Sequence, residues 1–158
     1  MASETDQVVD HWLPNVELIM QANQQLQQAR IAMMNHMLSS LEDDMLKQEN
    51  AVLLNWSNFF LSMTNYSKTI STDEDRQLYE AAMQSADQYY DMNYRILNLS
   101  KENKETAKLL YREDVSKFEA IGSDLAKIVE YNQHMATETG RSSQRIYDKG
   151  SLLNMIIV

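Results

Sequence analysis

Apolar side chains recur along most of this chain in alternating steps of three and four residues, the spacing of a helix face that packs on other helices. No stretch shows the strict alternation typical of a strand. The first stripe predicts a helix over about residues 6–42, with Pro14 near its start, where a fixed φ angle is tolerated. Its members are Trp12, Val16, Ile19, Asn23, Leu26, Arg30, Met33 and Met37.

Polar segments divide the remaining chain into three more predicted helices, over about residues 46–69, 73–100 and 104–150. The acidic run Glu42–Asp44 is the expected separator between the first two helices. Ser71 and Glu74 have the spacing of a capping box, in which the two side chains satisfy free N–H groups at a helix start. Asn103 is expected to cap the fourth helix.

Four amphipathic helices joined by short turns predict an all-α fold, an antiparallel up-down-up-down four-helix bundle with long first and fourth helices. The whole chain, residues 1–158, is then one domain. Both long ends protrude at the same pole, as expected of an insert between two membrane helices. The apolar run over residues 152–158 is accordingly expected to lead into a membrane helix.

Composition narrows the classes of function. Among 158 residues there are one Pro, three Gly and no Cys, which favours long helices and excludes disulfides and thiolate metal sites. The chain has 14 Lys or Arg against 23 Asp or Glu, a formal charge of −9, so a nucleic acid partner is not expected.

Catalytic and metal-binding motifs find little support. Carboxylate-bridged metal bundles need Glu three residues before His, and none of His11, His36 and His134 has it. No Gly-rich loop could hold a phosphate group. We therefore expect no catalytic residues, no metal and no cofactor, and a protein that is not an enzyme.

Arg30 is the polar residue that stands out on the first stripe. A buried guanidinium group needs an anion, because burying an unpaired charge costs several kcal/mol. The anion can be a carboxylate of the chain, or the stem can pack while the charged head reaches solvent. Alternatively, the anion is a ligand carboxylate, which a guanidinium group can bind with two parallel hydrogen bonds.

The antiparallel arrangement brings other polar groups to the height of Arg30. If the first helix turns near residue 43 and the fourth begins near residue 104, the stretch 111–118 lies beside it. That stretch offers two hydroxyls, a second cation and an aromatic wall, although each residue also has an ordinary structural interpretation. The predicted ligand site comprises Arg30, Met34, Asn35, Tyr111, Arg112, Ser116 and Phe118. Asn23 and Asn132, also on the stripes, are more typical of residues that set helix register.

Several short motifs, in this order and spacing, resemble the sensor domain of bacterial methyl-accepting chemotaxis proteins. They are Asp10–Pro14, Arg30, the Ser-Thr-Asp-Glu-Asp-Arg segment between Tyr66 and Tyr79, and Ile128–Asn132. The resemblance covers nearly the whole chain. It implies that this chain is the periplasmic domain of a receptor in the bacterial inner membrane, with a membrane helix on either side of it. It also implies a homodimer through the first helix and a downstream cytoplasmic signalling module.

The resemblance also implies a small organic acid or amino acid as ligand, bound by the first and fourth helices near the membrane-distal end. Arg30 matches the first of three arginines in the aspartate sensors, where this chain continues with Asn35 and Ser39. A dicarboxylate, tricarboxylate or aromatic acid is therefore expected, with Arg112 as second cation. Binding would signal through a displacement of the fourth helix by ~1 to 2 Å.

Two alternatives have the same helices. The sensor domain of a membrane histidine kinase would differ only in the segments that follow it. A structural coiled-coil interaction module would have the apolar stripes but would need no buried Arg30.

Overall fold

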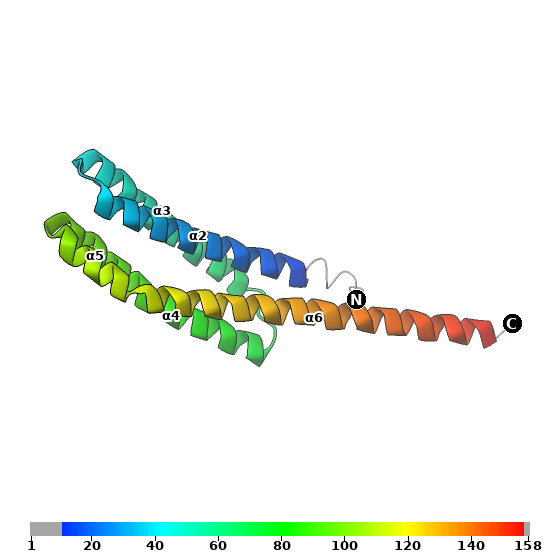
Figure 1. The fold of residues 1–158 in the computed structure, drawn as a ribbon. Helices are drawn as coiled ribbons and strands as arrows, with labels where there is room; N and C mark the ends of the chain where they lie inside the picture. The colour runs from blue at the N-terminus through cyan, green and yellow to red at the C-terminus, as the bar shows by residue number, and fades with distance from the viewer. Residues whose placement is uncertain (1–10, 157–158) are drawn as a thin grey trace.

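The computed structural model describes residues 11–156, with side chains up to residue 145 except residue 143. The described part is all-α, and its chain runs back and forth along a bundle as expected (Figure 1). Its helices are α2 (Leu13–Leu38), α3 (Glu42–Ser67), α4 (Asp73–Glu102), α5 (Lys104–Glu113) and α6 (Val115–Ile156). α2 pairs with α3, and α4 pairs with α5 and α6, which follow one another as the fourth column of the bundle.

The first hairpin turns earlier than predicted. α2 ends at Leu38 and α3 begins at Glu42, so the connection is residues 39–41. The acidic run Glu42–Asp44 is not the separator but the first turn of α3, where negative side chains interact favourably with the helix dipole. Ser39 Oγ donates to the carbonyl of Asn35 at 2.8 Å and helps to end α2.

The caps of the second hairpin are partly as predicted. Asn103 caps α5, since its side chain accepts a hydrogen bond from the Thr106 N–H at 3.1 Å. At the start of α4 the cap is Thr72 instead of Ser71, and it accepts from the Asp75 N–H at 3.2 Å. The carboxylate three positions after the cap is therefore that of Asp75, and it faces the core.

The fourth column is interrupted where a single helix over 104–150 was expected. α5 ends at Glu113 and α6 begins at Val115, with Asp114 between them. Asp114 keeps nearly helical angles (φ −81°, ψ −1°), and its N–H bonds to the Leu110 carbonyl at 3.1 Å, so the column continues through the irregularity. α6 has 42 residues and extends past the other helices (Figure 1).

The ends of the chain bear on two further expectations. α2 has 26 residues, as many as α3, and residues 6–10 of the predicted first helix lie outside the described residues. α6 continues to Ile156, but the side chains of the apolar run 152–158 lie outside the described part, so its membrane role stays a prediction. None of the helices described has the combined length and apolar character that crossing a membrane requires.

At three positions of α2 the buried residue is the one that comes just before the residue predicted by the stripe. The core-facing residues of this buried seam are Trp12, Asn15, Ile19, Ala22, Leu26, Ala29, Ala32, Met33, His36 and Met37. Asn23 is exposed, and Arg30 is half-buried at the edge of the seam. Alanines at the contact let two helix backbones approach closely, which places Ala22 and Ala29 inward and leaves the longer polar side chains outside.

A buried polar layer joins all four columns near the α3–α4 connection. Asn15 donates to Asn132 Oδ1 at 3.1 Å, and Asn132 Nδ2 donates to the Tyr66 hydroxyl at 2.8 Å. The Tyr66 hydroxyl donates in turn to Asp75 Oδ1. Burial raises the pKa of the Asp75 carboxyl, although the Tyr66 hydroxyl opposes that shift. The layer agrees with the register role predicted for Asn132, since each hydrogen bond needs its helices at a set height.

Candidate functional site

Arg30 lies on α2, at the point where this helix meets α4, α5 and α6. Its guanidinium carbon lies 4.5 Å from the centroid of the Tyr111 ring and 4.4 Å from that of Phe118. Nη1 donates to the Tyr89 hydroxyl at 3.1 Å. These three aromatic residues come from α5, α6 and α4. We call the arrangement of Arg30 with Tyr89, Tyr111 and Phe118 the arginine clamp.

The aromatic residues of the clamp also hold one another. The rings of Tyr89 and Phe118 have centroids 5.6 Å apart, and the Tyr111 hydroxyl donates to the Arg30 carbonyl at 3.4 Å. Tyr89 is fully buried, and burial raises the pKa of its phenol although Arg30 opposes the shift. The phenol is therefore neutral near pH 7, and the positive charge of Arg30 is met by ring faces and a hydroxyl dipole.

A buried carboxylate stands close to this cation. Asp114 is 1% exposed and occupies the irregularity between α5 and α6. Burial raises its pKa to about 6, while the charges of Lys117 and Arg30 oppose the shift. Lys117 Nζ lies 3.6 Å from Oδ1, and neither carboxylate oxygen has a hydrogen-bond donor among the described residues.

The internal salt bridge considered for Arg30 is not formed. Among the ion pairs of the described residues, none includes its guanidinium group. The aromatic faces screen the stem and the flat sides of the group, and Arg30 as a whole is half-buried. The clamp therefore positions a cation that no carboxylate of the described chain neutralises by direct contact.

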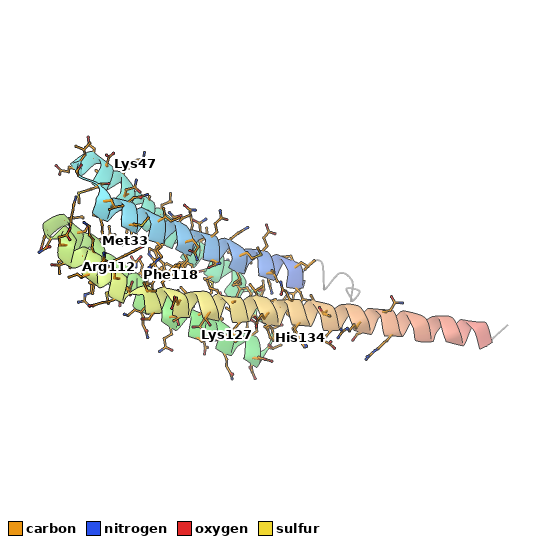
Figure 2. All side chains as sticks on the ribbon, viewed as in Figure 1. Met33, Lys47, Arg112, Phe118, Lys127 and His134 are labelled. Carbon is orange, nitrogen blue, oxygen red and sulfur yellow. The ribbon has the colours of Figure 1, made fainter. Side chains whose placement is uncertain are left out.

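The structure brings together part of the predicted ligand site. Arg30, Tyr111 and Phe118 meet in the clamp. Asn35 is half-buried, and its carbonyl accepts from Ser39. The other predicted members are exposed and take no part in the clamp: Met34, Arg112 and Ser116. Figure 2 labels Arg112 on α5 and Phe118 on α6, on either side of the irregularity.

Two members of the site were absent from the prediction. Asp114 lies three residues after Tyr111 and four before Phe118, so all three share one helix face, and this spacing was a usable signal. Tyr89 lies on the apolar stripe of α4, where its ring is ordinary core. Its hydroxyl contact with Arg30 depends on how α2 and α4 lie against each other, which periodicity does not specify.

A shallow groove lies between α2 and α6, nearer than the clamp to the start of α2, and it shares no residue with the clamp. It has a volume of about 270 Å³ and is mostly apolar, and its lining residues are Ile19, Met20, Asn23, Gly122, Leu125, Ala126, Val129 and Glu130. A Cβ atom added at Gly122 would meet nothing within 4 Å, so the α6 side of the groove is open.

The outer face of α2 carries a second seam with the same three-and-four spacing. Every member is exposed, and the members are Leu13, Glu17, Met20, Gln24, Gln27, Ile31, Met34 and Leu38. Only Glu17 among them is charged, although the chain as a whole has 37 charged residues. We call this face the outer seam of α2.

Comparison with known proteins identifies relatives of this bundle. The family model described as "Four helix bundle sensory module for signal transduction" matches residues 1–147. "Putative sensory transducer protein YvaQ" of Bacillus subtilis (strain 168) is 26% identical over 97 residues. That similarity covers 61% of this chain and 17% of the relative, so the chain corresponds to a small part of it.

Proposed function

Because this chain belongs to the family of four-helix-bundle sensory modules for signal transduction, we propose that it binds a small organic acid at the arginine clamp. The chain is the sensory bundle of a chemotaxis-type transducer, and the proposal places it on the periplasmic side of the membrane receptor. The observation that carries the ligand class is the half-buried Arg30, fixed by aromatic rings and without a carboxylate partner among the described residues.

The geometry of the clamp favours a carboxylate attached to an apolar body. Nη1 is engaged by Tyr89, and no other hydrogen bond from the Arg30 side chain is found in the described part of the chain. The remaining N–H groups of the fork suit a ligand carboxylate. The rings of Tyr111 and Phe118 can then contact the rest of the ligand. An aromatic acid fits this combination better than a tricarboxylate, which would need cations that Arg112 does not supply here.

A homodimer completes the proposed site. The outer seam of α2 has the alternating spacing of a coiled-coil interface, and its near absence of charge lets two copies of a −9 chain approach along it. Arg30 directly precedes Ile31 of this seam, and its guanidinium group forms the clamp with the three aromatic residues. A ligand on Arg30 would therefore lie at the edge of the dimer interface, where the partner's α2 can contact it.

Signalling follows from the connection between the site and α6. A ligand that binds α2 and the fourth column more tightly in one arrangement than in another shifts the population toward that arrangement. Asp114 interrupts the column next to the clamp, and α6 continues from there past the bundle (Figure 1). A displacement of ~1 to 2 Å could pass along this helix.

Calorimetry and thermal unfolding of this domain with benzoate, succinate and citrate test the proposal. A ligand at 100 times its Kd adds ~2.7 kcal/mol of stability, which a thermal shift detects. Arg30→Ala should abolish binding, whereas Arg95→Ala, which removes an exposed arginine of α4, should not. Unchanged affinity in Arg30→Ala would overturn the assignment of the clamp. Absence of binding by every acid would favour a structural module without a small ligand.

A further inference from the structure

Both hairpins turn at the pole of the bundle away from the protruding end of α6 (Figure 1). A second cavity is lined by residues at this pole. Its volume is about 370 Å³, and it is formed by the end of α2, the start of α3 and the end of α4. The lining residues are His36, Glu42, Met45, Leu46, Glu49 and Lys101. It shares no residue with the arginine clamp.

His36 is a polar group at the wall of this cavity, and it is 0% exposed. Nδ1 lies 2.5 Å from Ser100 Oγ, and that hydroxyl is also placed to donate to the Leu97 carbonyl at 3.3 Å. When the Ser100 hydroxyl donates its proton to the Leu97 carbonyl, the hydrogen bond between His36 and Ser100 is donated by Nδ1–H. Nε2 then carries a lone pair, and no donor for it is found among the described residues.

Nε2 lies on the side of the imidazole away from the contact between Nδ1 and Ser100. His36 lines the cavity and Ser100 does not, and Nε2 itself is fully buried. Burial lowers the pKa of His36, so the ring is neutral, and with its proton on Nδ1 the lone pair lies on Nε2. The Met45 thioether side chain at the wall is flexible, so it can move to admit a ligand N–H group.

The charges around the cavity favour a cation. Lys101 is paired with Glu49 at 2.7 Å, so these two charges balance. Glu42 remains, and it takes part in no ion pair of the described residues. Lys104, whose charge also acts on His36, donates to the Ser39 carbonyl and does not line the cavity.

We propose that this cavity is a second ligand site, which binds a small organic ammonium ion through Glu42 and His36 Nε2. Met45 and Leu46 would contact a short apolar body on the ligand. An ammonium group suits the site better than a metal ion, since no group of three or more His, Cys, Asp or Glu able to hold a metal is found in the described residues. Its N–H groups can satisfy a carboxylate and an imidazole lone pair together.

Calorimetric titration of the chain with isobutylammonium chloride tests this site. We expect saturable binding that Glu42→Gln weakens about tenfold, because a charge-assisted hydrogen bond is lost. Glu42 is exposed, so this variant should fold normally. The matched control is Asp43→Asn, which removes a charge from the same turn of α3 but lines no part of the cavity.

The outcomes separate this site from the arginine clamp. Isobutyrate, with the same carbon skeleton and the opposite charge, should not compete, and Arg30→Ala should leave ammonium binding unchanged. A second substitution, His36→Phe, keeps a ring in the core and should also weaken binding. Absence of saturable binding, or an equal loss in Glu42→Gln and Asp43→Asn, would overturn the proposal.

Discussion

The guanidinium carbon of Arg30 lies 4.4 Å from the centroid of the Phe118 ring, a contact that joins α2 directly to α6. The same group lies over the Tyr111 ring of α5, so one side chain spans the irregularity at Asp114. Arg30 therefore connects the face proposed for dimer formation with the helix proposed to carry the signal. Changing the Phe118 ring tests this contact while the charge of Arg30 is kept.

Phe118→Leu should lower the free energy of unfolding by about 1 kcal/mol, because the cation–π contact is lost while an apolar side chain remains. The same change should weaken binding of an aromatic acid more than binding of succinate, since it removes a ring from the proposed site. Urea unfolding and calorimetry measure the two effects. Leu109→Ala, at an exposed position on α5, is the control and should change stability by less than about 0.5 kcal/mol.

Asp114 predicts a specific pH dependence. Its pKa is raised from 3.8 to about 6 in the folded chain, so the folded state holds a proton that the unfolded state has already released. Its contribution to stability is therefore greatest below pH 3.8 and is lost as the pH rises through about 6. The free energy of unfolding should fall across this window, and Asp114→Asn should flatten that fall.

Urea unfolding at several pH values between 4 and 7 measures the effect of Asp114. Asp91→Asn, at an exposed position on α4, should keep the wild-type profile. If Asp114→Asn also kept it, the buried carboxylate would not be the group that titrates. Organic acid binding should weaken over the same pH rise, because an ionised Asp114 repels a carboxylate bound at Arg30.

The helix stripes that contain large side chains were predicted well from the sequence. On α3 the side chains of Val52, Trp56, Phe59, Met63 and Tyr66 recur in steps of three and four residues, and all five are buried. Ile70, which continues this stripe in the sequence, lies beyond the end of α3 and is half-buried. Bulky apolar groups leave one side of the helix to face the core, so their spacing defines that side. On α2 the stripe was displaced at Asn15, Ala22 and Ala29. Alanine carries little apolar surface, so the close packing of Ala22 and Ala29 is visible only when the neighbouring helix is present, and the burial of Asn15 depends on its hydrogen bond to Asn132 of α6.

The candidate site was predictable where it depends on height along the bundle. Antiparallel columns of known length place Arg30 beside Tyr111 and Phe118, and the structure shows these contacts. The direction in which each side chain points from its helix axis was harder to predict. Arg112, one residue after Tyr111, is turned about 100° away from it on the helix and is exposed. Tyr89 joins the clamp through lateral packing of α4, which no spacing along one helix encodes.

Asn132 tests the buried polar layer. Asn132→Ala removes its bonds to Asn15 and to the Tyr66 hydroxyl and leaves a buried amide without that partner. We expect a loss of about 2 to 3 kcal/mol in the free energy of unfolding, because unsatisfied buried polar groups are costly. Gln133→Ala, at the adjacent exposed position, should cost less than about 0.5 kcal/mol. A similar loss in both variants would mean that the layer does not stabilise the bundle.

The outer seam of α2 makes a prediction about association. Ile31→Glu places a carboxylate at an exposed apolar position of the seam, so two copies would bring like charges together at the interface. We expect the wild-type chain to sediment as a dimer and this variant to be monomeric at the same concentration, with helical content unchanged. Leu54→Glu makes the same chemical change at an exposed leucine of α3 and should leave the dimer intact. If Leu54→Glu dissociated the dimer and Ile31→Glu did not, the interface would lie on α3, and a ligand at Arg30 would be bound within one copy of the chain.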